Sequence, residues 1–263
     1  MSYQTIRIEQ DEQGIACVTL NRPDKHNAMN EEMIMDLTQA AASLGGDERV
    51  RVILLAGEGK SFCAGGDLGW MQQQAGKDRE GKIEQASMLA AMLASWNSMP
   101  KPVVGRVHGA VYGGGMGLVA ICDVVVAADD CRFALTETRL GLVPATIGPF
   151  VLSRLGGSFA RQVFFNARPF DAEFLMRAGL VAHICVAAEL DDAARKEAGY
   201  FLECAPGAVA DAKALCRKLA GADPGAMKEM TANALADRWE TSEAQAGIEA
   251  FFAKTSPPWR TGY

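Results

Sequence analysis

Three short, almost uninterrupted apolar segments constrain the fold of this chain more than any other feature of its sequence. Residues 50–56 (VRVILLA), 102–107 (PVVGRV) and 124–127 (VVVA) are rich in β-branched side chains. They lack the polar–apolar alternation of a strand with one face in water, so each is predicted to be a strand covered on both faces. Covering both faces of a sheet requires helices above and below it, which predicts a layered α/β fold.

Around these strands the sequence predicts a hairpin and several helices. Residues 6–8 and 15–20 are separated by a turn that ends in Gly14, which favours an antiparallel hairpin. Asn30 is suited to cap the first helix, because its side chain can accept a hydrogen bond from a free amide of the first turn. The predicted helices cover residues 30–46, 83–96, 116–121, 190–202, 208–219 and 226–252.

The predicted elements divide the chain into two parts. Residues 1–188 contain every predicted strand and form an α/β body, whereas residues 189–263 contain helical patterns only. No low-complexity linker separates the two parts. We therefore expect one domain with a helical C-terminal region attached to it.

Composition and charge exclude several classes of protein. Of the 263 residues, 49% are hydrophobic and 22% are charged, which is typical of a globular protein and not of a disordered chain. The formal net charge of −6, without a basic run, disfavours binding to nucleic acid or to anionic lipid. The N-terminus shows no signal-peptide pattern, and Asp123 interrupts the apolar stretch at 109–122 before it could span a membrane. We expect a cytoplasmic protein.

The cysteines and histidines predict neither a metal site nor nucleophilic catalysis. Seven cysteines are an odd number with no CxxC pair, so they are expected to be small buried apolar residues in a reducing cytosol. Cys63 has no neighbouring histidine to act as its base, which favours a structural role for it. His26, His108 and His183 are scattered, which disfavours a Ser–His–Asp triad or a histidine-bound metal.

Two glycine-rich turns follow two of the predicted strands. They cover residues 61–67 (SFCAGGD) and 109–115 (GAVYGGG). Two nearby motifs fail as nucleotide-binding sites. Residues 57–61 (GEGKS) end like a phosphate loop, but Leu54 stands where its first glycine is needed, and for residues 113–117 (GGGMG) Leu118 stands where a dinucleotide fingerprint needs its third glycine. Both turns are expected at the carboxyl ends of neighbouring strands, where ligands bind in open α/β sheets. Their backbone amides could form an oxyanion hole, although glycine content alone is equally compatible with two tight turns.

Five segments of the chain resemble one protein family. SFCAGGDLGWM, VHGAVYGGGMGLVAICDVVVAADD and FALTETRLGLVP occur in the order and spacing of the enoyl-CoA hydratase/isomerase, or crotonase, superfamily. The likeness runs from VTLNRPDKHNAMN to GIEAFFAKTSPPW and so covers nearly the whole chain. The resemblance implies a spiral of repeated β-β-α turns, with C-terminal helices that assemble the chain into a homotrimer or a dimer of trimers (a homohexamer).

The resemblance also implies a substrate and a set of site residues. The substrate is an acyl-CoA thioester, so coenzyme A is part of the substrate and no separate cofactor or metal is expected. Gly66 and Gly114 supply the two backbone amides that hold the thioester oxygen, and Glu137 matches a catalytic glutamate, which we assign as the general acid and base. The positions implied or considered for substrate binding are Lys25, Ala64, Gly65, Asp67, Leu68, Trp70 and Lys254, of which Lys254 acts across a subunit boundary.

One departure from the family pattern leaves two reactions open. Hydratases of the family with two glutamates carry the second one two residues after the glycine triplet, where this chain has Gly117. A single glutamate can take a proton from water and return it to the α-carbon, which is hydration. It can equally move a proton between the α- and γ-carbons, which is Δ3,Δ2-enoyl-CoA isomerisation. A non-catalytic acyl-CoA-binding homologue is a third possibility, which the retention of Glu137 disfavours.

Other segments resemble a subgroup of the family that hydrates glutaconyl-type CoA esters. Residues 142–150 (LVPATIGPF) replace a glycine-rich segment, and they occur together with Gly117 and residues 67–71 (DLGWM). This resemblance implies a methylglutaconyl-CoA-like substrate and a place in fatty acid, leucine or acyclic terpene catabolism. Such substrates have a distal carboxylate that needs a cationic or amide partner. The arginines considered for this role are Arg139, Arg154 and Arg161, and the partner stays unassigned.

Overall fold

A six-stranded sheet forms the centre of the fold, with strand order β1-β2-β3-β4-β6-β8. The computed structural model describes residues 3–220 and 224–260. β1 pairs antiparallel with β2, and every following pair in the sheet is parallel. The strands are β1 (Ile6–Gln10), β2 (Ile15–Leu20), β3 (Val52–Gly57), β4 (Val103–Val107), β6 (Val124–Ala128) and β8 (His183–Cys185), and a small second sheet pairs β5 (Ala110–Tyr112) with β7 (Arg132–Ala134).

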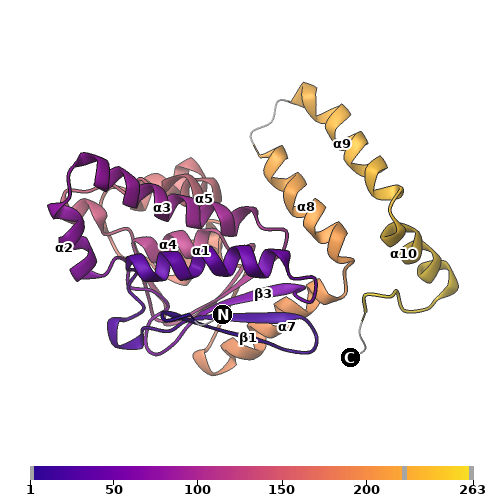
Figure 1. Cartoon of the computed structure of the whole chain (residues 1–263), viewed down its shortest axis with the longest axis horizontal. Coiled ribbons are helices and arrows are strands. Elements are labelled where there is room, and N and C mark those ends of the chain that lie inside the picture. The colour runs from indigo at the N-terminus through magenta and orange to yellow at the C-terminus, as the bar shows by residue number, and fades with distance from the viewer. Residues whose placement is uncertain (1–2, 221–223, 261–263) are drawn as a thin grey trace.

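Helices cover both faces of the main sheet. α1, α3, α4 and α5 lie on one side of it, and α7 lies on the other (Figure 1). The helices are α1 (Glu31–Gly46), α2 (Leu68–Gly76), α3 (Arg79–Ser98), α4 (Gly114–Ala120), α5 (Gly148–Val163), α6 (Ala172–Arg177), α7 (Leu190–Leu202), α8 (Pro206–Leu219), α9 (Pro224–Trp239) and α10 (Ser242–Ala253), with 3-10 turns η1 (Pro23–Lys25), η2 (Glu137–Leu140) and η3 (Ala187–Glu189). The predicted α/β layering is confirmed.

Burial of apolar side chains explains this arrangement. All residues of β3 are buried, as expected for a strand with helices on both faces. Asn30 caps α1 by accepting a hydrogen bond from the Met33 amide, as predicted. Trp96 of α3 is fully buried and donates from its indole nitrogen to the Leu37 carbonyl of α1 at 2.8 Å. These contacts fix the helical layer over the strands whose ends carry the glycine-rich turns.

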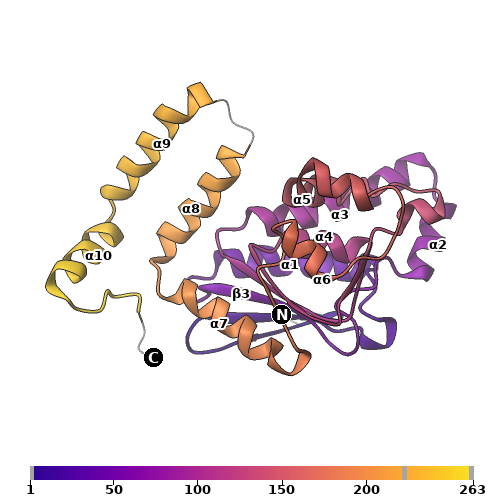
Figure 2. The ribbon, with the colours of Figure 1, turned by 180° about the vertical axis from the view of Figure 1, so that it is seen from behind.

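The C-terminal helices form an arm that extends away from the body. α9 and α10 lie apart from the other helices in both views of the chain (Figures 1 and 2), whereas α8 contacts the body through Lys213, which pairs with Asp123 at 2.7 Å. α7, although part of the predicted helical region, packs against β3, β4 and β6 of the main sheet. The division at residue 188 stays a prediction. None of the helices in residues 3–220 and 224–260 has the length and apolar character that a membrane span requires.

Two predictions about these segments were wrong. Residues 226–252 are not one helix, because the chain breaks between α9 and α10. Thr241 stands at the break, where its hydroxyl accepts from the Ala244 amide and so caps α10. The cysteines are not all buried: Cys204 and Cys216, on the helical region, are exposed.

Candidate active site

The two glycine-rich turns lie side by side at the carboxyl ends of β3 and β4, as predicted. These strands are parallel neighbours in the main sheet. Cys63 donates from its amide to the Ala110 carbonyl at 3.2 Å and accepts from the Tyr112 amide at 3.0 Å. The predicted structural role of Cys63 fits its environment, since burial raises the pKa of its thiol to about 12 and keeps it neutral.

The backbone N–H of Gly66 points away from Met29, the residue with which Gly66 is paired. Met29 donates to the Gly65 carbonyl at 2.7 Å and accepts from the Asp67 amide at 2.8 Å, which forms a short parallel bridge. In such a bridge the central residue directs its own N–H to the opposite side. Within the part of the chain that the structure describes, the Gly66 N–H donates to no protein group. It is therefore available to a ligand.

Gly114 provides a second available amide, at the first position of α4. The preceding Gly113 has φ of 46°, a left-handed conformation that favours glycine, and its amide donates to the Ala134 carbonyl at 2.9 Å. The first amides of a helix have no partner within the helix. Among residues 3–220 and 224–260 the Gly114 N–H has none either.

The backbones of the two turns are in direct contact. A Cβ atom built on Gly115 would lie 2.4 Å from the Cys63 carbonyl oxygen, so only glycine permits this approach. A Cβ atom built on Gly113 would lie 3.9 Å from the Cα of Gly65. Two available amides on contacting turns are the components of an oxyanion hole, which stabilises a developing negative charge on oxygen.

The carboxyl group of Glu137 lies beside the second turn. Its Oε1 atom is 3.3 Å from the place where a Cβ of Gly113 would stand. Its Oε2 atom is buried and has no hydrogen-bond partner within the described residues. Burial raises the pKa of this carboxyl above its ordinary value, because removal from water disfavours the charged form. A buried carboxyl with a raised pKa is typical of a general acid or base.

Apolar side chains occupy the space beside Gly117, where a second glutamate stands in two-glutamate hydratases. A Cβ at this position would lie 2.7 Å from Cγ2 of Ile147 and 3.2 Å from Cδ1 of Leu93. Ile147 is 1% exposed, and Leu93 is fully buried. A carboxylate side chain does not fit here unless these neighbours move.

Replacement of Gly117 by Ala is expected to lower the free energy of unfolding by about 1–3 kcal/mol, the usual cost of overpacking a core. Ile147→Leu removes the obstructing Cγ2 methyl group, so the double variant should recover part of this loss. Urea unfolding of both single variants and the double variant measures the coupling. Strictly additive losses would show that Ile147 is not the obstacle.

Most of the predicted substrate-binding residues lie at or near the first glycine-rich turn, whereas Lys254 lies on the C-terminal arm. Gly65, Ala64 and Trp70 lie at or next to the first turn, and the Ala64 amide donates to the His26 carbonyl at 3.0 Å, beside Lys25. Leu68 is 82% exposed at the start of α2. Their roles in binding substrate stay predictions.

Lys254 and the three arginines are placed differently. Lys254 follows α10 on the C-terminal arm, away from the glycine turns of its own chain (Figure 1). Arg139 and Arg161 are exposed. Arg154 donates to the Asp123 carbonyl at 3.3 Å, just before β6 begins, and so lies at the opposite edge of the sheet from the site. Within this chain, Arg154 is thus engaged elsewhere.

Arg22 is a site-supporting residue that the sequence analysis missed. Its guanidinium donates to Asp67 Oδ2 at 3.0 Å and also to the Ala28 carbonyl. Asp67 in turn accepts from the Gly69 and Trp70 amides and caps α2. Burial alone raises the pKa of Asp67, but the hydrogen bonds from the Trp70 amide and Arg22 outweigh it and lower the pKa. Arg22 thereby holds the residue next to Gly66.

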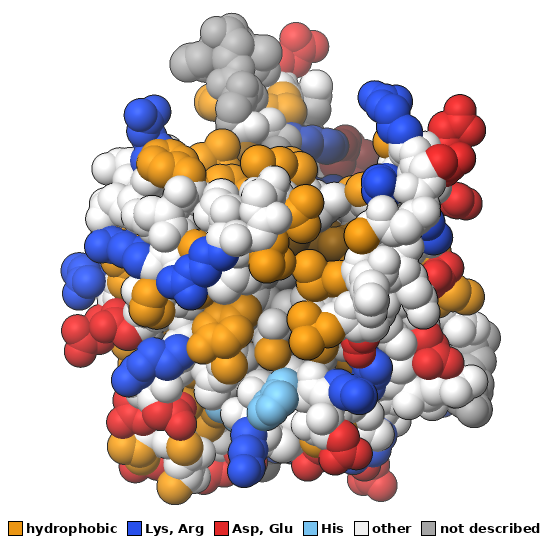
Figure 3. All heavy atoms as spheres, turned by 90° about the vertical axis from the view of Figure 1, so that its left-hand side faces the viewer, with side chains coloured by type: hydrophobic (Ala, Val, Ile, Leu, Met, Phe, Trp, Pro, Cys, Tyr) orange, Lys and Arg blue, Asp and Glu red, His pale blue; other side chains and the backbone are white. Residues whose placement is uncertain are grey.

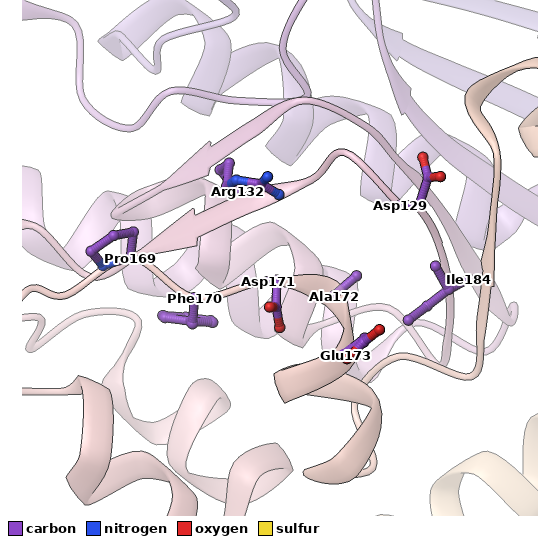
Figure 4. Close-up of a pocket in the computed structure, with 8 residues that line it drawn as sticks. All are labelled: Asp129, Arg132, Pro169, Phe170, Asp171, Ala172, Glu173 and Ile184. Carbon is purple, nitrogen blue, oxygen red and sulfur yellow. The ribbon is translucent and has the colours of Figure 1, made fainter.

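A separate surface pocket of about 400 Å³ lies near β7 and α6. Figure 4 shows its lining, in which the side chains of Asp129, Asp171 and Glu173 surround the hollow together with Arg132 and Phe170. Asp171 caps α6 by accepting from the Phe174 amide at 2.8 Å. None of the predicted site residues lines this pocket, so it is distinct from the glycine-turn site.

Comparisons with known proteins agree with this geometry. The enoyl-CoA hydratase/isomerase family profile matches residues 10–262. A crotonyl-CoA hydratase of Syntrophomonas wolfei is 30% identical over 256 residues, which cover 97% of each chain. The crystal structure of an enoyl-CoA hydratase from Shewanella pealeana superposes with a TM-score of 0.94 at 33% identity, covering 97% of this chain and 96% of that one. AtuE of Pseudomonas aeruginosa gives a TM-score of 0.94 at 34% identity, covering 98% and 100%. The chain belongs to the enoyl-CoA hydratase/isomerase family.

Proposed function

We propose that this protein is a lyase that adds water across the double bond of an α,β-unsaturated acyl-CoA thioester. One observation carries the proposal: the available amides of Gly66 and Gly114 lie on contacting turns, and beside them lies the Glu137 carboxyl, whose Oε2 atom is buried without a hydrogen-bond partner among the described residues. Relatives named as enoyl-CoA and crotonyl-CoA hydratases support the same class of activity.

In the proposed reaction, Glu137 moves one proton and the two amides stabilise one charge. The ionised carboxylate takes a proton from water while the water oxygen bonds to the β-carbon. The electrons of the double bond move toward the thioester, whose oxygen becomes an enolate held by the Gly66 and Gly114 N–H groups. Glu137 then returns the proton to the α-carbon and the thioester carbonyl reforms. The product is a 3-hydroxyacyl-CoA, and the carboxylate is regenerated.

The proposed acyl group is of the glutaconyl type, with a methylglutaconyl-CoA-like ester as the leading example. The segment at 142–150, which carries the resemblance to this subgroup, adjoins the catalytic carboxyl: the Leu142 amide donates to the Glu137 carbonyl at 3.0 Å. Leu142 and Val143 are 53% and 71% exposed. Their position beside Glu137 supports a role for this segment in selecting the acyl chain.

The C-terminal arm supports the proposal that the chain assembles into homotrimers or dimers of trimers. Phe251 and Phe252 of α10 are each 78% exposed, and Leu235 and Trp239 of α9 are exposed as well. Large apolar side chains in such numbers on one arm are typical of an interface. In a trimer, Lys254 would reach the coenzyme A phosphates of a neighbouring subunit. Light scattering of the purified protein measures the assembly.

A product assay tests the proposed reaction. Purified protein is mixed with conjugated 2-enoyl-CoA esters that are short, branched or carboxylated, and separately with 3-enoyl esters. Hydration removes the absorbance of the conjugated enoyl thioester and yields a 3-hydroxyacyl-CoA. Isomerisation, for which one carboxyl also suffices, produces that absorbance from a 3-enoyl ester. Turnover of the 3-enoyl ester without hydration would replace the proposal by an isomerase, and binding without either reaction by a non-catalytic homologue.

The value of kcat/KM is expected to fall at low pH with an apparent pKa above 4.5, the ordinary value for a glutamate. Glu137 must be ionised to accept a proton from water, and burial raises its pKa, so protonation inactivates the free enzyme at a higher pH than for an exposed glutamate. A pH–rate profile of kcat/KM checks this. An acid limb at or below the ordinary value would contradict it.

The raised pKa of Glu137 also predicts how the stability of the folded chain depends on pH. A carboxyl whose pKa is raised in the folded state contributes stability below its unfolded pKa, and that contribution is lost as the pH rises through the folded pKa. Glu137→Gln should therefore be more stable than the native chain at neutral pH, as measured by urea unfolding. Well below pH 4.5 the two proteins should unfold alike.

A further inference from the structure

Asn27 has a fully buried side-chain amide that the proposed mechanism does not use. The amide nitrogen donates to the carbonyl oxygens of Glu58 and Ser61, each at 2.8 Å, although these residues are 31 and 34 positions away in the sequence. The amide oxygen accepts from the backbone N–H of Arg22 at 2.8 Å. A side-chain amide has two N–H donors, so both are used here. A single side chain thus bonds to backbone groups from two separate stretches of the chain.

The backbone conformation of residues 22–29 suits an asparagine at this position. His26 and Asn27 have φ of 52° and 53°, in the left-handed region, which asparagine adopts more readily than most residues other than glycine. The Asn27 N–H donates to the Arg22 carbonyl at 2.9 Å, so the main chain and the side chain of Asn27 both bond to Arg22 and close the turn between them. Asparagine therefore meets a backbone requirement and a hydrogen-bonding requirement together.

The two carbonyl groups that accept from the amide lie at the entrance to the first glycine-rich turn. Glu58 directly follows β3, and Ser61 is the first residue of the turn. The chain folds back tightly between them, since a Cβ atom built on Gly57 would lie 2.7 Å from the Phe62 carbonyl oxygen. The amide therefore fixes where the first glycine-rich turn begins relative to residues 22–29.

Residues 22–29 continue alongside this turn as far as Gly66. The His26 carbonyl accepts from the Ala64 N–H at 3.0 Å, and Met29 makes the bridge that directs the Gly66 N–H outward. Asn27 lies between His26 and Met29 in the sequence. A shift of residues 22–29 relative to the turn must therefore change the direction of the Gly66 N–H.

Met29 also connects this arrangement to the second glycine-rich turn. A Cβ atom built on Gly114 would lie 2.9 Å from Cε of Met29, so the buried methionine side chain packs against the residue that supplies the second amide. The two residues between which the thioester oxygen is proposed to bind, Gly66 and Gly114, thus both contact Met29. Asn27, two positions earlier, holds the backbone that carries it.

Asn27 itself does not meet a ligand. Figure 3 shows the end of the molecule at which α2 lies in Figure 1, where hydrophobic side chains gather over the middle of the face. The exposed fraction of Asn27 is 0%, so its amide is part of neither this surface nor any other. Its effect on a reaction must pass through the backbone that it holds.

We propose that Asn27 is a positioning residue of the oxyanion hole, whose buried amide aims the Gly66 N–H at the thioester oxygen by holding residues 22–29 against residues 58–61. The proposal rests on the proposed function in one respect, namely that the oxygen of an acyl-CoA thioester lies at the Gly66 and Gly114 amides. A residue that only stabilised the fold would change the free energy of unfolding and leave the polarisation of a bound thioester unchanged.

The carbonyl stretching frequency of a bound thioester measures this polarisation without any turnover. Hydrogen bonds to the carbonyl oxygen weaken the C=O bond and lower its stretching frequency. The probe is hexanoyl-CoA labelled with carbon-13 at the thioester carbon, and its frequency is read from infrared difference spectra of the free and bound forms. The values of kcat and KM for a 2-enoyl-CoA are measured separately, and urea unfolding establishes that each variant is folded.

Two variants remove the donors in different ways. Asn27→Gly keeps the left-handed backbone conformation and removes the whole amide. Asn27→Asp keeps the size of the side chain and the acceptor for the Arg22 N–H, and loses both N–H donors. The second variant leaves no cavity, so an effect that both share comes from the lost donors and not from lost packing.

Two control variants separate positioning from stability. Asn166→Gly removes an exposed asparagine amide that also bonds to backbone groups, the Gln162 carbonyl at 2.7 Å and the Arg168 N–H at 3.1 Å. Leu44→Ala removes a buried side chain near the end of α1, roughly 20 Å along the helix from Glu31, where α1 begins. This second control destabilises the core at a distance from the glycine-rich turns.

Both Asn27 variants should raise the carbonyl frequency of bound hexanoyl-CoA toward that of the free thioester. The value of kcat should fall by up to about 10²-fold, the loss that a misplacement of about 1 Å can cause. KM should change much less than kcat, because the lost stabilisation belongs to the transition state. Asn166→Gly and Leu44→Ala should keep the native frequency and the native kcat, although Leu44→Ala unfolds at lower urea.

The proposal is overturned if the folded Asn27 variants keep the native carbonyl frequency and kcat, or if Leu44→Ala raises the frequency as much as they do. Failure of both Asn27 variants to fold would assign the amide to the fold alone and would also overturn it. The proposed function fails separately: if the native chain lowers the carbonyl frequency in an Asn27-dependent manner but hydrates no unsaturated ester, the positioning role stands and the hydratase assignment falls.

Discussion

Replacement of Glu137 by Gln is expected to lower kcat by about 10²–10⁴-fold, the usual effect of losing a general acid or base. Glutamine has nearly the same shape as glutamate but cannot accept a proton from water or return one to the α-carbon. Because the amides of Gly66 and Gly114 belong to the backbone, the variant should still bind acyl-CoA. The measurements are steady-state turnover of a 2-enoyl-CoA and the Kd of a saturated acyl-CoA.

Glu12→Gln is the matched control for this variant, since Glu12 is an exposed residue in the turn between β1 and β2. It makes the same chemical change away from the site and should keep native turnover. If Glu137→Gln retained native turnover while folded, the carboxyl would not be the proton carrier, and the proposed mechanism would have to be abandoned.

Replacement of Gly115 by Ala is expected to lower kcat by about 10²–10³-fold, which is the measured cost of losing one oxyanion donor in other enzymes. The new methyl group would lie 2.4 Å from the Cys63 carbonyl oxygen, a backbone atom that cannot rotate away. The start of α4 must shift, and the Gly114 amide moves with it relative to Gly66. Turnover and the circular dichroism spectrum are measured together, so that loss of the hole is separated from loss of the fold.

Gly157→Ala in α5 is the control for adding a methyl group to a helical glycine. A Cβ at Gly157 would meet no heavy atom within 4 Å. This variant should keep native turnover, because the added methyl group contacts nothing. If Gly115→Ala were folded and as active as Gly157→Ala, the two amides would not act as a pair.

The fold and the centre of the site could be predicted from the sequence because their signals are local. An uninterrupted apolar segment identifies a strand such as β3 without knowledge of its neighbours, and Asn30 caps α1 through an amide three residues away. The glycine turns are similar, since each needs glycines at fixed positions. The two turns were expected to lie together because β3 and β4 are adjacent parallel strands, whose carboxyl ends lie at the same edge of the sheet.

Features that depend on contacts between distant residues could not be predicted. Arg22 and Asp67 are 45 positions apart, and nothing in either local sequence indicates that they pair. The buried side-chain atoms of Trp70 and Gln74 that lack a hydrogen-bond partner among the described residues become visible only when the packing of α2 is known.

The break at Thr241 was missed because helical patterns continue on both sides of it, and a single capping residue is a weak signal. The role of Glu137 came from family resemblance, because an isolated glutamate after a strand is usually solvated.

The bridge between Met29 and the turn at Gly66 has a consequence for how such an enzyme diversifies. Both proposed donors of the oxyanion hole are main-chain N–H groups, and the bridge that orients the Gly66 N–H is also made of main-chain hydrogen bonds. Only substitution by proline deletes a backbone N–H group, whereas every side chain along α2 is open to replacement. Related proteins can therefore differ in the side chains that face the acyl group while they keep the same main-chain groups of the proposed oxyanion hole.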